Sequence, residues 1–226
     1  MYGSVLFCLT RYALTGEPAQ NMAKIQKEIF DIYKRDKVYI RFPNIKVSMF
    51  SNRAKANLRG KAAEIKCLGP VLLEIWEKRM NPEIEMHQKV RLLIKLSVLL
   101  DEKLEAIPQA CYTTPRDMRL DLLDTCHTFL CLWNETQAFF GNNEDAQDNE
   151  LFHITRKAHF LLHCCVERSN PKKMWCFRGE DLMARMRKLA FSCAKRCQSW
   201  QIGNKAIGKY CVALDMLFKS LDAVAV

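Results

Sequence analysis

Residues 82–104 read PEIEMHQKVRLLIKLSVLLDEKL, and this stretch decides the fold class. After Pro82, apolar residues recur every three or four positions, so they would share one face of an α-helix with its 3.6 residues per turn. The repeated apolar positions are Met86, Val90, Leu93, Leu96, Leu100 and Leu104. The stretch therefore predicts a long amphipathic helix whose apolar face packs against other helices.

Four further stretches have the same spacing, and proline marks several helix starts, because its fixed φ suits the first helical turn. The four stripes are Met118, Leu122, Cys126, Phe129 and Trp133; Leu151, Ile154, Ala158, Leu162 and Cys165; Leu182, Met186, Leu189, Cys193 and Cys197; and Ile207, Tyr210, Leu214, Leu217 and Leu221. The prolines that we interpret as starts are Pro18, Pro70, Pro82 and Pro115. Five amphipathic helices predict an all-α fold, an irregular array of many helices.

Signals for β-strands are confined to residues 37–50 and 174–177. These runs are β-branched or aromatic, and Pro, Asn or Gly flanks them. They are too short to build a sheet domain. We therefore expect at most a few short strands within the all-α fold.

The charge is distributed unevenly along the chain. Residues 1–150 hold 21 Lys or Arg and 20 Asp or Glu, whereas residues 151–226 hold 14 and 5 and so supply +9 of the net +10. The acidic, Asn-rich residues 141–150 predict an exposed loop at this change. We expect a near-neutral helical region over 1–150 and a basic helical region over 151–226 that packs on it in one globular body.

A basic region favours polyanions, among which nucleic acid is the commonest, while a solvated basic face without a partner is the alternative. Two groups of cations are candidates for phosphate contacts. The first group is Arg53, Lys55, Arg59 and Lys61; the second lies on or near a basic amphipathic helix after Gly179 and comprises Arg178, Arg185, Arg187, Lys188, Lys195, Arg196 and Lys205. A surface helix whose cations keep it solvated explains the second group equally well.

His159 and His163 are candidate metal ligands, because residues four apart on a helix point to one side. Cys164, Cys165 and Cys176 are the nearby thiols, but a CxxC pair and the Glu of a zincin are missing, so a packed or hydrogen-bonded role is favoured over zinc. Glu180 and Asp181 open the basic helix, where the helix dipole stabilises negatively charged carboxylates. Helix capping explains these two acids, and a metal-binding catalytic role is the alternative.

The 11 cysteines follow no regular framework of spacings, so we expect reduced thiols, mostly buried, in a reducing compartment. The first ten residues lack the basic start and the cleavage site of a secretory signal. The chain also has no apolar run of roughly 18 to 20 residues, the length that spans a bilayer. These observations predict an intracellular protein without a membrane partner.

Four segments carry a resemblance to known proteins: LRGKAAEIK at 58–66, Gly-Pro at 69–70, KAHFLLH at 157–163 and WCFRGEDLM at 175–183. They resemble an abundant family of uncharacterised proteins from dinoflagellate algae, over most of residues 42–220. This resemblance implies a lineage and no reaction.

The C-terminal part resembles eukaryotic DDE-type transposases. The similarity lies in the Lys-x-His-x-Leu-x-His run at 157–163, the following Trp175, and the acid that opens a basic helix. It implies that Glu180, or else Asp181, corresponds to the last catalytic acid, which would use a divalent metal. The strands with the two earlier acids have no counterpart, since the only aspartates of residues 1–50 are Asp31 and Asp36, and neither lies on a convincing strand. The resemblance thus implies the C-terminal part of a longer protein.

These observations lead to a ranked set of functions. We expect a non-catalytic, transposase-derived helical module that binds DNA or another nucleic acid through its basic C-terminal helix, without a cofactor and in the nucleus. The alternative is a helical protein-interaction module in the cytoplasm, which binds its partner through an apolar groove. The third is the C-terminal part of a metal-dependent DDE nuclease. The oligomeric state stays open.

Overall fold

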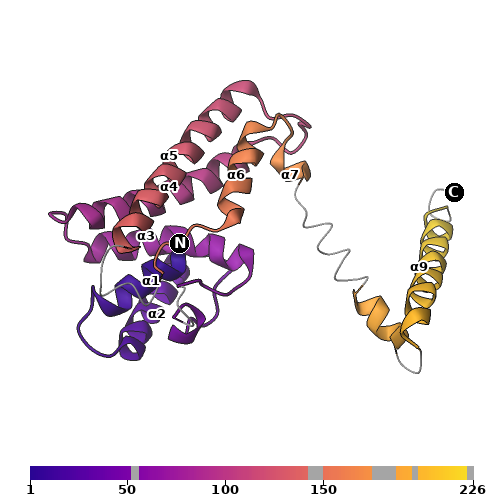
Figure 1. Ribbon diagram of the computed structural model, residues 1–226, viewed down its shortest axis with the longest axis horizontal. Coiled ribbons are helices and arrows are strands. Elements are labelled where there is room, and N and C mark those ends of the chain that lie inside the picture. Colours follow the sequence, from indigo (N-terminus) through magenta and orange to yellow (C-terminus); the bar gives the residue numbers. More distant parts are fainter. Residues whose placement is uncertain (52–55, 142–149, 175–186, 195–197, 223–226) are drawn as a thin grey trace. The chain divides into compact units, whose positions relative to one another are not determined.

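The computed structural model is all-α, which confirms the predicted fold class (Figure 1). It describes residues 1–51, 56–141, 150–174, 187–194 and 198–222. The helices are α1 (Tyr2–Arg11), α2 (Pro18–Arg35), the 3₁₀ helix η1 (Val47–Met49), α3 (Ala62–Arg79), α4 (Glu85–Ala106), α5 (Arg116–Gly141), α6 (Arg156–Val166), α7 (Pro171–Met174) and α9 (Ser199–Asp222), and residues 187–194 are also helical.

The chain divides into two compact units, Met1–Lys173 and Met174–Val226. The change in charge balance lies near residue 150, whereas the division by contacts follows Lys173, so α6 and α7 belong to the first unit. The packing of a basic region on the rest of the chain stays a prediction. None of the described helices is long and apolar enough to cross a bilayer.

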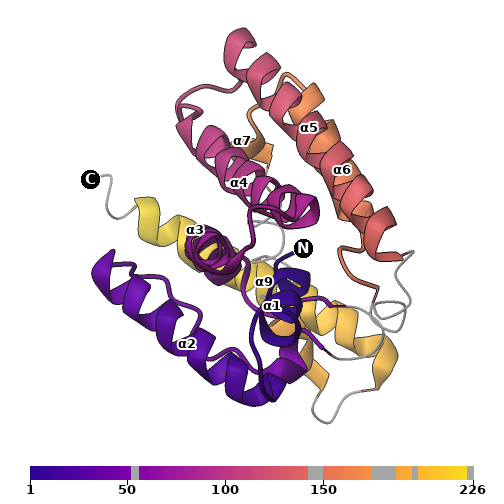
Figure 2. The ribbon, with the colours of Figure 1, turned by 90° about the vertical axis from the view of Figure 1, so that its left-hand side faces the viewer.

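The core of the first unit is built around α1, which contacts both α2 and α3. Every residue from Tyr2 to Thr10 is buried, because the sequence YGSVLFCLT is apolar or small on all sides. Gly3 permits this position, since a Cβ there would lie 2.2 Å from the carbonyl oxygen of Ala56. Helix α4 packs between α3 and α5, and α5 and α6 lie side by side (Figure 2).

The proline signals gave mixed results. Pro18 is the first residue of α2, as predicted, and Pro115 immediately precedes α5. Pro82 lies three residues before the start of α4. Pro70 lies inside α3, so its prediction as a helix start was wrong. Proline removes one backbone hydrogen bond, but the buried residues Leu68, Val71, Leu72, Ile75 and Trp76 hold α3 in the core on both sides of it.

Residues 37–50 form no strand; they run as an irregular segment that ends in η1. Their apolar residues Phe42, Ile45 and Phe50 are buried. The backbone N–H of Ile45 donates to Gln26 Oε1 at 2.8 Å, so a side chain of α2 takes the place of a neighbouring strand. Of the second strand signal, Met174 ends α7 and residues 175–177 lie outside the described residues.

Three of the predicted stripes lie on α4, α5 and α9, within the bounds given above. The stripe from Leu151 to Cys165 begins too early, because α6 starts only at Arg156. Leu151 is nevertheless buried, in the turn that leads into α6. The stripe from Leu182 to Cys197 is described only over residues 187–194, which are helical as predicted.

Candidate functional site

A basic and aromatic surface lies on the helix 187–194. Arg187, Lys188 and Phe191 are exposed, and Phe191 keeps 69% of its accessible surface. Phe191 follows the two cations by four and three positions, so all three share the outer side of the helix. Cys193 is buried on the opposite side. We call Arg187, Lys188 and Phe191 the outer basic surface; no carboxylate of the described residues pairs with its two cations.

Helix α9 adds further cations and aromatic rings to the second unit. Lys205 is exposed, and Lys209 Nζ donates to Ser192 Oγ at 3.3 Å, which links α9 to the helix 187–194. Trp200 and Tyr210 are exposed with relative areas of 68% and 37%. The second unit therefore presents both groups that bind single-stranded nucleic acid, cations for phosphates and rings for bases.

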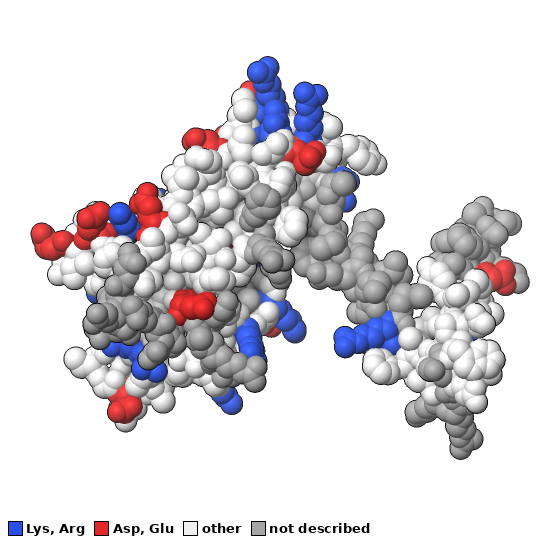
Figure 3. Space-filling model, in the orientation of Figure 1, with Lys and Arg blue, Asp and Glu red and all other residues white. Residues whose placement is uncertain are grey.

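The first unit carries its charge differently, with acidic and basic side chains interspersed over the face shown in Figure 3. Many of its cations are paired with acids. The pairs are Arg35 with Glu74 at 2.6 Å, Arg91 with Glu77 at 2.6 Å, Lys103 with Asp121 at 2.5 Å, Lys89 with Glu135 at 3.4 Å, Arg79 with Glu28, and Lys66 with Glu105. Each of these acids neutralises its cation locally, so the paired cations attract a phosphate group less than unpaired ones would.

The charge per residue supports the same contrast between the units. Residues 1–173 hold 26 Lys or Arg and 21 Asp or Glu, and residues 174–226 hold 9 and 4. Each unit therefore has a net charge of +5, but the second unit carries it on 53 residues and the first on 173. The second unit is the more basic body.

The predicted phosphate-binding residues fall into three groups. Arg59 and Lys61 belong to the first unit, where both are exposed and Lys61 Nζ lies 3.7 Å from Glu64 Oε1. Arg187, Lys188 and Lys205 belong to the second unit and are exposed. Outside the described residues lie Arg53, Lys55, Arg178, Arg185, Lys195 and Arg196, as do the two candidate acids Glu180 and Asp181. The transposase-like acid therefore stays a prediction.

The candidate metal ligands His159 and His163 both lie on α6. The side chain of His159 is outside the described part, and His163 is exposed. Among the side chains that the structure describes, no group of three or more His, Cys, Asp or Glu could hold a metal ion. Cys165 is buried and shares a hydrogen bond with Cys126 of α5, which raises the pKa of Cys165 and lowers that of Cys126.

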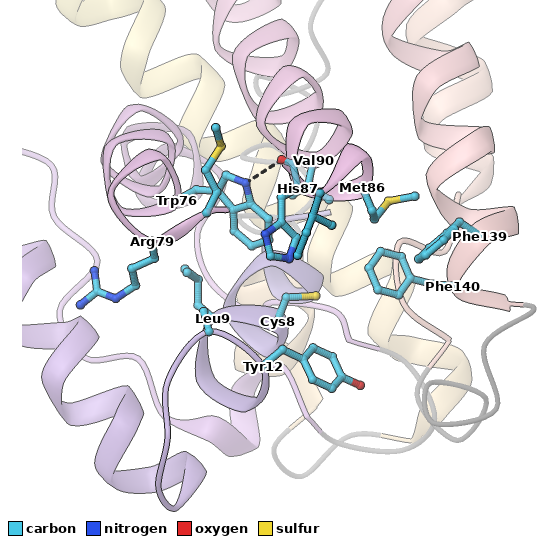
Figure 4. A pocket seen from close by; sticks show the side chains of 13 residues that line it. Cys8, Leu9, Tyr12, Trp76, Arg79, Met86, His87, Val90, Phe139 and Phe140 are labelled. Atoms are coloured by element: carbon cyan, nitrogen blue, oxygen red, sulfur yellow. Dashed lines mark hydrogen bonds between the residues drawn. The ribbon is translucent and has the colours of Figure 1, made fainter. Parts of the chain in front are cut away.

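The first unit contains an apolar cavity of about 310 Å³, large enough for a small ligand or a partner's side chain (Figure 4). It is lined by residues of α1, α3, α4 and α5 and of the turns after α1 and α3. The lining residues are Cys8, Leu9, Tyr12, Ala13, Trp76, Arg79, Met80, Ile84, Met86, His87, Val90, Phe139 and Phe140.

The polar groups of this cavity are held by neighbouring residues. Trp76 Nε1 donates to the carbonyl oxygen of His87 at 3.0 Å, and the two rings meet edge to face with centroids 5.6 Å apart. His87 Nδ1 accepts the backbone N–H of Asn81 at 3.0 Å, so the neutral imidazole carries its proton on Nε2. Desolvation lowers the pKa of His87, which favours this neutral form. Arg79 is held by Glu28.

The sequence patterns did not reveal this cavity. Met86 and Val90 were assigned to a helix stripe, but Trp76, His87 and Phe139 belonged to no predicted site. The lining residues come from separate helices, so their spacing in the sequence carries no signal. The only sequence feature that points toward the cavity is an aromatic residue just past an apolar stripe, as at Phe139 after the stripe of α5.

Comparisons of this chain with models of known protein families, with curated proteins and with solved structures gave no match.

Proposed function

We propose that the unit Met174–Val226 binds nucleic acid through the outer basic surface of Arg187, Lys188 and Phe191. The observation that carries the proposal is the exposure of two cations, which no carboxylate of the described residues pairs with, beside an exposed aromatic ring on one side of a helix. Arg187 and Lys188 contact phosphates, and Phe191 stacks on a base. The proposal keeps the non-catalytic module expected from the transposase-like sequence, with no metal and no cleavage.

The chemistry of this surface favours a single strand over a duplex. Phosphate neutralisation acts on both, because each carries the same kind of charge. Stacking on an aromatic side chain needs an exposed base face, which a duplex hides, and it contributes about 1–3 kcal/mol per base. We therefore expect single-stranded DNA or RNA to bind more tightly than a duplex of the same length.

The test is fluorescence anisotropy with a labelled single strand of about 20 nucleotides. The full chain should bind, and the logarithm of its affinity should fall linearly with the logarithm of the salt concentration. The double variant Arg187→Gln/Lys188→Gln should weaken binding and reduce that slope by about one to two, since each lost phosphate contact removes 0.7 to 0.9. Phe191→Ala should weaken binding to the single strand more than to the duplex.

The matched control is Lys24→Gln/Lys27→Gln, which removes two exposed cations from α2 of the first unit. It changes the net charge equally, so it separates a local contact from a general effect of charge. Equal loss of affinity in the two double variants, or an affinity of the full chain that does not respond to salt, would contradict the proposal.

A second candidate function is protein binding through the apolar cavity of the first unit. The cavity favours it because its wall combines aromatic and methionine side chains with few polar groups, a composition that accepts an apolar side chain. Binding there would be nearly indifferent to salt, in contrast to phosphate binding. An environment-sensitive uncharged dye, Nile red, should bind the native chain and should bind less to Val90→Phe, in which the added ring fills the cavity.

A further inference from the structure

Helix α9 carries an exposed apolar stripe with a regular spacing. Trp200 and Ile207 keep 68% and 59% of their accessible surface, and Tyr210 keeps 37%. The sequence continues the spacing through three leucines, so that steps of three and four alternate without interruption from residue 200 to residue 221. The seven positions are Trp200, Gly203, Ile207, Tyr210, Leu214, Leu217 and Leu221.

This spacing is a heptad repeat, in which the stripe occupies the positions named a and d. Helices that pair in a coiled coil have apolar residues at an average step of 3.5 residues. A helix that packs one face on a globular core has only an approximate period of 3.6 residues. Position a holds Trp200, Ile207, Leu214 and Leu221, and position d holds Gly203, Tyr210 and Leu217. The repeat covers nearly the whole of α9, which spans Ser199–Asp222.

The charged residues of α9 lie away from the stripe. All five occupy the outer heptad positions b, c and f: Lys205, Lys209, Asp215, Lys219 and Asp222. The flanking positions e and g hold no charge: Asn204, Ala206, Cys211, Ala213, Phe218 and Ser220. Charged residues at positions e and g determine which helices pair, through ion pairs between the two helices. When these charges have the same sign, two identical helices repel each other. Their absence allows two copies of α9 to approach each other without repulsion, although the unit is basic.

Among the described side chains, the first half of this stripe, from Trp200 to Tyr210, is exposed. The helix 187–194 meets α9 near Lys209, and Cys193 and Ala206 are the apolar side chains that become buried among those described there. At 1.5 Å per residue the described stretch 187–194 is about 12 Å long and α9 about 36 Å, so this stretch can cover only part of the stripe.

We propose that α9 pairs with α9 of a second copy of this chain in a two-stranded coiled coil. A strip about 36 Å long and about 10 Å wide on each copy gives roughly 700 Å² of buried surface in total, below the 1,200 Å² of standard stable interfaces. The dimer is therefore expected in the micromolar range. The outer basic surface lies on the other helix, so pairing leaves Arg187 and Lys188 accessible.

The experiment is sedimentation of the full chain without nucleic acid, from about 1 to about 200 μM, a range that brackets micromolar affinity. The chain should pass from monomer to dimer as its concentration rises. Ile207→Lys should abolish the dimer, because it places a charge at position a. The control is Val212→Lys, which adds the same charge to the same helix at the outer position f, where Val212 is 61% exposed; it should leave the dimer intact.

A second pair of variants tests whether the stripe forms the dimer contact, by a gain in the affinity of dimerisation. A Cβ at Gly203 or at Gly208 would meet no atom within 4 Å, so both positions have room for a larger residue. Gly203→Leu fills position d and should tighten the dimer about tenfold or more, because a buried leucine replaces a gap. Gly208→Leu raises helix propensity equally but lies at the outer position b, so it should change the affinity much less.

A chain that stays monomeric throughout this range, with Gly203→Leu also monomeric, would overturn the proposal and would indicate that the stripe packs within its own chain. Equal effects of Ile207→Lys and Val212→Lys, with helicity retained by circular dichroism, would assign the dimer to another surface. Arg187→Gln/Lys188→Gln should leave the dimer unchanged. The failure of self-association and the failure of nucleic-acid binding are thus distinguishable.

Discussion

Ser4 Oγ accepts the backbone N–H of Phe152 at 2.8 Å, which joins two residues 148 positions apart in the chain. Phe152 is fully buried and has a φ of 56°, an uncommon conformation for a residue with a side chain. Its carbonyl oxygen accepts a hydrogen bond from Trp133 Nε1 at 2.7 Å. Both backbone groups of the strained residue are therefore bonded, and the turn before α6 is fastened to α1 and α5.

Replacing Ser4 by alanine should lower the free energy of unfolding by about 1–3 kcal/mol, because it leaves the buried N–H of Phe152 without an acceptor. Urea denaturation of the two proteins measures this difference. Ser48→Ala is the control, since Ser48 is an exposed residue within η1 and its loss should change stability by less than about 0.5 kcal/mol. Equal effects at the two serines would show that the Ser4 hydrogen bond contributes nothing specific.

The ion pair between Glu28 of α2 and Arg79 of α3 should make stability depend on pH. Two hydrogen bonds from the Arg79 guanidinium lower the pKa of Glu28 from its usual value in the folded chain. The stabilisation is therefore present above the unfolded pKa and is lost as the pH falls through the lower folded pKa. Glu28→Gln should cost about 1 kcal/mol at neutral pH and progressively less at acidic pH, as the carboxylate becomes protonated.

Chemical denaturation at neutral and at acidic pH tests this dependence. The control is Glu102→Gln, which removes an exposed carboxylate from α4 and should change stability little at either pH. A cost of Glu28→Gln that is the same at neutral and at acidic pH would contradict the assigned ion pair. Acid protonates the Glu28 carboxylate, so the ion pair can contribute only while this carboxylate is charged.

The amphipathic helices could be predicted from the sequence because each has one apolar side, as in α4 and α5. Helix α1 was not predicted, and its burial does not follow its own sequence pattern: the polar Ser4 and Thr10 are buried along with Val5 and Leu6, because other helices pack around it. Pro70 was wrong as a helix start for a related reason. Local preference favours a break at proline, but burial on both sides of it decides the outcome.

The candidate surface was more accessible to sequence reasoning than the cavity. Arg187 and Lys188 lie opposite an apolar stripe, so their exposure follows from the helical period alone. The cavity depends on which helices meet, as Trp76 and His87 meet across the turn after α3. Periodicity within one helix contains no information about such a meeting.

The cysteines should differ sharply in reactivity. All nine that the structure describes are free thiols; Cys8, Cys126, Cys165 and Cys193 are buried, and Cys131, Cys164 and Cys211 are exposed. Burial raises the pKa of Cys8 to about 12, which suppresses its reactive thiolate. Alkylation of the native chain followed by peptide mapping should label the three exposed cysteines first and the four buried ones only in denaturant. Rapid native labelling of Cys8 would contradict the buried position of α1.

Two valines that are equally buried should respond oppositely to one added methylene group. Val90 lines the apolar cavity and Val5 does not, although neither has any exposed surface. Val90→Ile can extend into the open volume, so it should stabilise the fold by up to about 0.8 kcal/mol, the value of one buried CH₂ group. Val5→Ile has no such space and should destabilise it by about 1–3 kcal/mol through overpacking. Thermal unfolding of both variants measures the contrast, and a cavity that is filled by the chain's own side chains would make Val90→Ile destabilising as well.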